Sequence, residues 1–255
     1  MNNDKAAVKV NETQGKIGIA GSTLKLIAIV TMLIDHIAAV VLERIIANYA
    51  GDAKTLNTIY YIMRGIGRIA FPIFCFLLVE GFLHTRNIWK YALRLAIFAL
   101  VSEIPFDLAL HATPFYKNYQ NVFFTLLIGL LVLIGLKYTT ELINDNNAIL
   151  IYFTKIAIII AGMVAADLLK TDYSDLGVMT IIVMYLLRKN QAASMLAGCT
   201  VLTIFNYFEL PAFLAVIPAW LYNGKRGLKL KYVFYVFYPA HLFILYLICR
   251  FMRLV

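Results

Sequence analysis

Long apolar runs, broken by few charges, constrain this chain more than any other feature. The segment 122–136, for example, contains no ionisable residue. A helix needs about 20 mostly apolar residues to cross the hydrocarbon core, whereas a barrel strand alternates apolar and polar residues over about 10. The composition agrees, because 62% of the 255 residues are hydrophobic and 15% are charged, against about 25% charged in soluble domains. The sequence therefore predicts an all-α, polytopic transmembrane helical bundle.

The apolar runs predict nine spans, with ten as the alternative. They cover 23–46, 65–83, 89–110, 121–137, 148–169, 176–188, 192–207, 210–222 and 230–251. The sixth to eighth are short, which suits tilted, re-entrant or broken helices. We expect a polar cytoplasmic tail over 1–22, followed by a single transmembrane domain over 23–255.

The distribution of Lys and Arg predicts the orientation. With the N-terminus inside, 14 of the 23 Lys and Arg residues fall in cytoplasmic segments, 6 fall outside and 3 lie within spans. This asymmetry follows the positive-inside rule and predicts a cytoplasmic N-terminus and an outer C-terminus. It also accounts for the net charge of +9 without a nucleic-acid partner.

Ionisable residues inside the first span are the first candidates for function, because such groups are costly in lipid unless they face protein or water. Lys25 and His36 are eleven residues apart, which places them on one helix face about 16 Å apart along the axis. Asp35 lies beside His36. A lone buried His is usually a packing residue, but two adjacent ionisable groups in lipid favour a functional role.

Later spans carry further polar pairs at helical spacing. Glu103 and Asp107 lie four residues apart around Pro105, and two close carboxylates in a dry site raise one pKa. The alternative is a capped helix end near the interface. Asn121 and Thr125, at the start of the fourth span, are positioned to hydrogen-bond those carboxylates.

Three more pairs have both a structural and a functional interpretation. They are Arg64 with Arg68, Glu80 with His84, and Tyr238 with His241. Interfacial anchoring and helix-surface pairing explain the first two without function. Histidine inside an apolar helix is unusual, which favours a role for the third. Cysteines lie only in apolar runs, and no metal-binding motif occurs, so we expect no disulfide framework and no metal.

Several blocks of this sequence together resemble the TraX family. The blocks are 24–39 (LKLIAIVTMLIDHIAA), 67–87 (GRIAFPIFCFLLVEGFLHTRN), 91–107 (YALRLAIFALVSEIPFD), 121–125 (NVFFT) and 238–242 (YPAHL). The resemblance extends over roughly 23–250 and is weak in the middle.

The resemblance implies an activity and a location. The family is associated with N-terminal acetylation of a conjugative pilin subunit in the bacterial inner membrane. It is similar to wider membrane acyltransferases that use acetyl-CoA and often show a basic residue, ten intervening residues and a His in the first span. Lys25 and His36 match that spacing, so the resemblance implies that His36 is catalytic, as base or transient acyl carrier.

We therefore expect a multi-pass acetyl- or acyltransferase of the cytoplasmic membrane. Its acceptor is an amine or hydroxyl, with a pilin or peptide N-terminus among the candidates, and its partners are acetyl-CoA and membrane lipids. The expected catalytic residues are His36, Asp35, Glu103 and Asp107. The expected donor-binding residues are Lys25, Arg86, Lys90 and Arg94. The expected substrate-binding residues are Arg68, Glu80, Asn121, Thr125, Tyr238 and His241.

Two functions of other classes compete with this hypothesis. A proton-coupled transporter uses buried Asp, Glu and His equally well, although the sequence shows no internal repeat. The other hypothesis is a non-enzymatic membrane assembly protein, and it predicts that replacement of His36 by alanine is tolerated.

Overall fold

A computed structural model describes residues 18–143, 147–228 and 231–255, and these residues form a helical bundle. Within this part of the chain, extended pairing is limited to two isolated bridges, Ile19 with Tyr222 and Gln120 with Thr171. The predicted all-α class is confirmed. Residues 1–17, which make up most of the predicted tail, and the cationic Lys229 lie outside the described residues.

The first span is one continuous rod that starts two residues earlier than predicted. It consists of α1 (Gly21–His36), a π-helical segment (Ile37–Leu42) and α2 (Glu43–Ala47). Its 27 residues correspond to about 40 Å at 1.5 Å per residue, enough to cross a bilayer. The π-helical turn begins directly after His36, and such turns are frequent at functional sites.

The second span differs from the prediction of 65–83. It comprises α3 (Lys54–Gly67) and α4 (Ala70–His84), with a turn at Arg68 and Ile69. This break precedes Pro72, so the proline falls in the first turn of α4. Backbone N–H groups in a first turn make no helical hydrogen bond, so the proline breaks none. A helix interruption, rather than a proline kink within one helix, therefore positions Arg68.

The remaining helices follow the predicted spans closely. They are α5 (Ile88–His111), α6 (Val122–Leu142), α7 (Ala148–Leu168), α8 (Ser174–Leu186), α9 (Gln191–Phe205), η3 (Tyr207–Ala215), α10 (Val216–Trp220) and α11 (Lys231–Phe251). Asparagine side chains cap four of these starts by accepting a backbone N–H, as N-cap residues do. The capping residues are Asn87, Asn121, Asn190 and Asn206.

Every predicted span contains a helix, but the number that can cross a membrane must be corrected. Within the described residues, five helices have both the length and the apolar composition of a span: 21–47, 54–84, 122–142, 148–168 and 233–251. Helix α5 has the length but carries four charged side chains. Helix α8 has 13 residues and extends for only about 20 Å, so α8, α9 and η3–α10 are too short for straight crossings.

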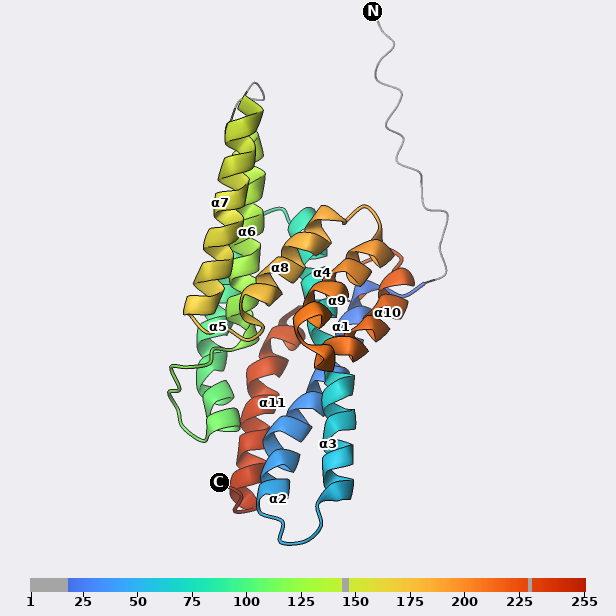
Figure 1. The fold of residues 1–255 in the computed structure, drawn as a ribbon, viewed down its shortest axis with the longest axis vertical. Helices are drawn as coiled ribbons and strands as arrows, with labels where there is room; N and C mark the ends of the chain where they lie inside the picture. Colours follow the sequence, from blue (N-terminus) through green and yellow to red (C-terminus); the bar gives the residue numbers. More distant parts are fainter. Residues whose placement is uncertain (1–17, 144–146, 229–230) are drawn as a thin grey trace, which may run out of the picture.

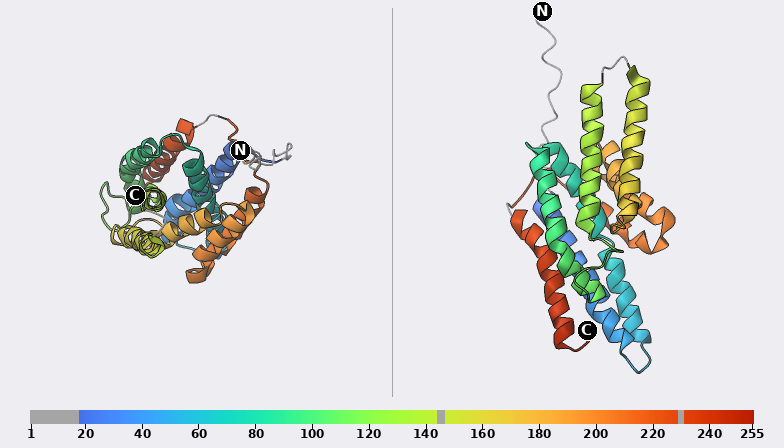
Figure 2. Two further views of the ribbon diagram at one scale, coloured as in Figure 1. Left: turned by 90° about the horizontal axis from the view of Figure 1, so that it is seen from above. Right: turned by 90° about the vertical axis from the view of Figure 1, so that its left-hand side faces the viewer.

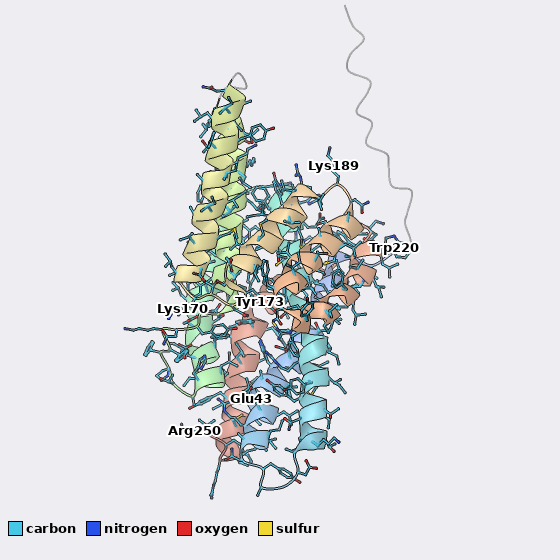
Figure 3. All side chains as sticks on the ribbon, in the orientation of Figure 1. Glu43, Lys170, Tyr173, Lys189, Trp220 and Arg250 are labelled. Atoms are coloured by element: carbon cyan, nitrogen blue, oxygen red, sulfur yellow. The ribbon has the colours of Figure 1, made fainter. Side chains whose placement is uncertain are left out.

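The short helices pack as a group toward the end of the molecule at which α1 begins. Helices α8, α9 and α10 lie side by side there, whereas α2, α3 and the end of α11 occupy the other end (Figure 1). Figure 2 shows α6 and α7 as a hairpin at one side of the bundle. Lys189 lies in the half of the molecule that contains the short helices, and Glu43 and Arg250 lie in the other half (Figure 3). The apolar core runs along the inner faces of α1, α4, α5 and α6.

Orientation in the membrane is testable with single cysteines. Lys54 begins α3 and Lys189 lies in the turn after α8, near opposite ends of the bundle. The positive-inside rule predicts that Lys54→Cys is labelled by an impermeant maleimide from outside and that Lys189→Cys is labelled only after permeabilisation. The three native cysteines are buried and serve as an unlabelled background. The reverse labelling pattern would overturn the predicted orientation.

Candidate functional site

A cavity of about 440 Å³ lies along the second half of the first rod, and we call it the histidine cavity. Residues from α1, α3, α4, α5 and α11 border it, together with two loops. Its polar lining consists of Asp35, His36, Glu43, Arg44, Arg64, Arg68, His111, Tyr119, Asp172, Tyr173 and Tyr238. The tertiary structure thus gathers ionisable groups that lie far apart in the sequence.

His36 and His241 form the central pair of this site. His36 Nδ1 lies 2.6 Å from His241 Nε2, and the two rings stack with centroids 4.9 Å apart. His241 Nδ1 lies 2.7 Å from the carbonyl oxygen of Phe237. A carbonyl oxygen only accepts, so we assign the proton of neutral His241 to Nδ1 and leave its Nε2 as acceptor. His36 then donates from Nδ1, and its own Nε2 carries the lone pair.

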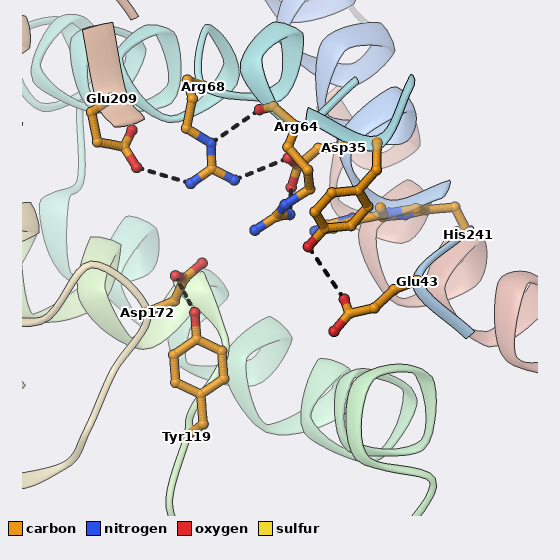
Figure 4. Close-up of polar contacts among 10 residues, drawn as sticks. Asp35, Glu43, Arg64, Arg68, Tyr119, Asp172, Glu209 and His241 are labelled. Atoms are coloured by element: carbon orange, nitrogen blue, oxygen red, sulfur yellow. Dashed lines mark hydrogen bonds and ion pairs between the residues drawn. The ribbon is translucent and has the colours of Figure 1, made fainter. Parts of the chain in front are cut away.

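A buried ion cluster lies beside this pair. Arg64 contacts Asp35 at 2.6 Å, and Arg68 bridges Asp35 and Glu209, each at 2.9 Å (Figure 4). The Asp35 side chain therefore binds two guanidinium groups. Asp35 was expected to be catalytic beside His36, but its carboxylate pairs with arginines and not with an imidazole. Adjacent helix positions point in different directions, so Asp35 faces α3 while His36 faces α11.

Gly67 allows this ion cluster to form. A Cβ atom at Gly67 would collide with the Asp35 side chain, so only glycine lets α3 approach the carboxylate this closely. Arg68 follows directly in the break between α3 and α4. Gly67 thus lets α3 approach Asp35 closely, and Arg68 supplies a guanidinium group that pairs with it.

Another wall of the histidine cavity is formed by two loops. The Tyr119 hydroxyl donates to Asp172 Oδ1 at 2.7 Å (Figure 4). Burial raises the pKa of Asp172 to about 6, and the neighbouring carboxylate raises the pKa of Tyr119. The Thr125 hydroxyl donates to the carbonyl of Asp172. Thr125 therefore supports this loop instead of the predicted carboxylates on α5.

Glu103 and Asp107 face the protein interior, as their spacing predicts, but they do not border either cavity described here. Glu103 accepts from the amide and side chain of Asn121, the former at 3.3 Å. Asp107 is 1% exposed and accepts from the amide of Tyr116 at 2.7 Å. The predicted hydrogen bond from Asn121 is confirmed for Glu103, but the described contacts place neither carboxylate against His36. Both carboxylates instead hold the loop between α5 and α6.

A second cavity, of about 650 Å³, lies along the first half of the same rod, and we call it the basic cavity. Lys25, Arg86 and Arg94 border it, as the hypothesis of a donor site requires, and Arg226 joins them. The Arg94 Nε atom is buried without a hydrogen-bond partner among the described residues. Lys90 does not border this cavity; it lies on the exposed face of α5.

Glu80 also borders the basic cavity, close to the side chain of Tyr222. The loop that contains Tyr222 and Arg226 is fastened to the start of α1. Gly21 N donates to the carbonyl of Lys225 at 2.8 Å, and Ser22 N donates to that of Arg226 at 3.0 Å. These bonds satisfy amides that every helix N-terminus leaves unpaired. They also hold Arg226 at the cavity.

Sequence reasoning missed or misjudged several residues of the two cavities and of the ion cluster. They are Arg64, Tyr119, Asp172, Glu209 and Arg226. Interfacial anchoring was the structural interpretation given for Arg64. Glu209 carried a usable signal, because a carboxylate within the apolar segment 207–220 requires a buried cation.

Comparison with known proteins supports a single family. The family model described as TraX protein matches residues 20–249. A protein of Dichelobacter nodosus described as "Probable fimbrial assembly protein FimC, serogroup H1" is 31% identical over 258 residues, covering 90% of this chain and 95% of the relative. No solved structure matches.

Proposed function

Because this chain belongs to the TraX family, we propose that it is an integral membrane acyltransferase that moves an acetyl group from acetyl-CoA to an amine or hydroxyl acceptor. The observation that carries the proposal is the His36–His241 pair, whose tautomers leave His36 Nε2 unprotonated. This nitrogen belongs to a residue that borders a cavity. An imidazole with this arrangement suits a general base.

The basic cavity suits the acyl donor. Acetyl-CoA is multiply anionic, and Lys25, Arg86, Arg94 and Arg226 supply positive charge along one cavity. The buried Arg94 Nε lacks a partner among the described residues, and a phosphate oxygen would satisfy it. Leucine side chains of α4, α5 and α6 also line the cavity and suit the uncharged arm of the donor.

The chemistry then follows from the position of His36. Its Nε2 accepts a proton from the acceptor amine or hydroxyl as the nitrogen or oxygen attacks the thioester carbonyl. The new bond forms to the carbonyl carbon, the C–S bond breaks, and the imidazolium returns its proton to the departing thiolate. His241 Nε2 accepts from His36 Nδ1 throughout and holds the ring in place.

The acceptor enters the histidine cavity in this proposal. Carboxylates of Glu43 and Asp172 border that cavity and suit a cationic amine. The relative named for fimbrial assembly makes a pilin N-terminus the first acceptor to test. The cytoplasmic membrane of a bacterium is the location consistent with a cytoplasmic donor.

The direct test measures transfer of labelled acetyl from acetyl-CoA to peptide N-termini and small amines by the purified protein. Transfer that depends on His36 supports the proposal. Failure to bind acetyl-CoA, together with no transfer to any amine or hydroxyl, would reject it.

Donor binding gives a second prediction. The double substitution Arg94→Gln and Arg226→Gln should weaken CoA binding at least tenfold, because each charge-assisted hydrogen bond contributes about 1.5–3 kcal/mol. Arg188→Gln is the matched control, since Arg188 is exposed beside Tyr185 and borders neither cavity. Calorimetry with CoA measures both. Equal affinity in the double variant would contradict the donor site.

A further inference from the structure

The two cavities share four bordering residues. Met32, Phe74, Val122 and Tyr238 line both the histidine cavity and the basic cavity. Along the first rod, Met32 lies about 10 Å beyond Lys25 and about 6 Å before His36 at 1.5 Å per residue. These four residues therefore lie between the cations of one cavity and the imidazole of the other.

The partition between the cavities is apolar except at one side chain. Met32, Phe74 and Val122 offer no side-chain hydrogen-bond donor, whereas Tyr238 carries a hydroxyl. Tyr238 is 3% exposed, and its hydroxyl lies near the backbone of Val122, the first residue of α6. The N–H of Val122, as the first amide of a helix, has no helical acceptor. Among the hydrogen bonds of the described residues, none uses the Tyr238 hydroxyl as a donor, and a substrate oxygen at the partition would give it an acceptor.

Ring packing fixes the position of this phenol. The Tyr238 ring meets His36 edge-on at 6.0 Å, His241 at 5.7 Å and Phe123 at 5.0 Å between centroids. The Tyr238 ring is therefore held beside the two imidazoles at the point where the cavities meet. Preorganised donors of this kind stabilise the charge that develops on a carbonyl oxygen, and they do so most effectively in an apolar site.

We propose that Tyr238 is a catalytic residue whose hydroxyl donates a hydrogen bond to the thioester carbonyl oxygen at the partition between the two cavities. This role rests on the proposed acyl transfer. When the acceptor attacks the carbonyl carbon, the carbonyl π electrons move to that oxygen, and the Tyr238 proton stabilises the charge. The electrons return when the C–S bond breaks, so Tyr238 keeps its proton over the whole cycle.

Tyr238→Phe tests the proposal because it retains the ring and removes only the hydroxyl. We expect kcat to fall about 10²–10³-fold, the effect of deleting one oxyanion donor, with the KM for acetyl-CoA unchanged. Tyr246→Phe is the control on the same helix; its hydroxyl contacts exposed Arg250, and it borders neither cavity. A Tyr238→Phe rate within twofold of wild type, or a higher KM at unchanged kcat, would overturn the assignment.

A spectroscopic measurement tests the same contact without turnover. Acetyl-CoA labelled with ¹³C at the carbonyl is bound to the His36→Ala protein, in which transfer is slow. We expect the carbonyl stretch to move to lower frequency on binding and to return toward its solution value when Tyr238→Phe is added. If the carbonyl frequency of the bound donor is the same with and without the Tyr238 hydroxyl, the role of Tyr238 is rejected and the proposed function stands. If the wild-type protein does not bind acetyl-CoA, the proposed function is rejected as well.

Discussion

Replacing His36 with alanine should lower acetyl transfer by about 10²–10⁴-fold, the usual contribution of a general base. The protein should remain folded, because His36 is half-buried beside a cavity and its side chain bonds only His241 among the described contacts. The measurement is the transfer of labelled acetyl from acetyl-CoA at saturating acceptor, with unfolding of the variant followed in parallel.

His241 gives this experiment a graded control. His241 is a positioning residue that accepts from His36 Nδ1, so His241→Ala should reduce transfer less than His36→Ala does. His241→Gln places a carbonyl oxygen near the same donor and should recover part of the loss. A fully active His36→Ala protein with an inactive His241→Ala protein would move the base to His241. Full transfer in both variants would place the base on a residue other than these two histidines.

Replacing Arg68 with methionine should cause the largest loss of stability. Arg68 neutralises Asp35 and Glu209 at once, and the side chains of all three residues are at most 11% exposed. Removing one partner of a buried ion pair costs about 3–5 kcal/mol, because the remaining charge is left uncompensated. This corresponds to a fall of roughly 6–20 °C in Tm at 2–4 °C per kcal/mol, measured by thermal unfolding in one fixed detergent.

Two further variants separate charge from packing at Arg68. Lys137→Met removes an ion pair with Glu141 whose side chains are 46% and 53% exposed, and an exposed pair of this kind contributes under about 1 kcal/mol. Adding Glu209→Gln to Arg68→Met should recover part of the loss, since it removes one uncompensated charge. Equal stability of Arg68→Met and Lys137→Met would contradict a structural role for the buried cluster.

The predicted pattern of helices is confirmed. It could be predicted because helix formation in a membrane depends on residues that are close together in the sequence. Apolar runs of span length leave the backbone no alternative to helical hydrogen bonding in lipid, and asparagine caps mark four helix starts. The second span was predicted incorrectly for a related reason. Its first half, α3, contains charged and polar residues such as Lys54 and Arg64, so a hydropathy argument begins the span later, at 65.

The candidate site was also predicted only in part. Sequence identified His36, Lys25 and His241 as residues that are costly in lipid, and their positions in the two cavities agree with that argument. It predicted the contact of Glu103 with Asn121 correctly, but Asp35 and Asp107, which it expected to be catalytic, pair with arginines and with a loop amide. Spacing along one helix states which residues share a face, but it does not state which neighbouring helix that face meets.

The sequence by itself determined the helical class, the positions of the helices and the family, because helix formation and membrane compatibility depend on residues near in sequence. Only the tertiary structure decided the partners. His36 meets His241 across 205 positions, and Arg68 meets Glu209 across 141. Such pairings depend on helix packing, on the close approach that Gly67 permits and on the break after α3. The division into two cavities separated by Met32, Phe74, Val122 and Tyr238 arises from that packing alone.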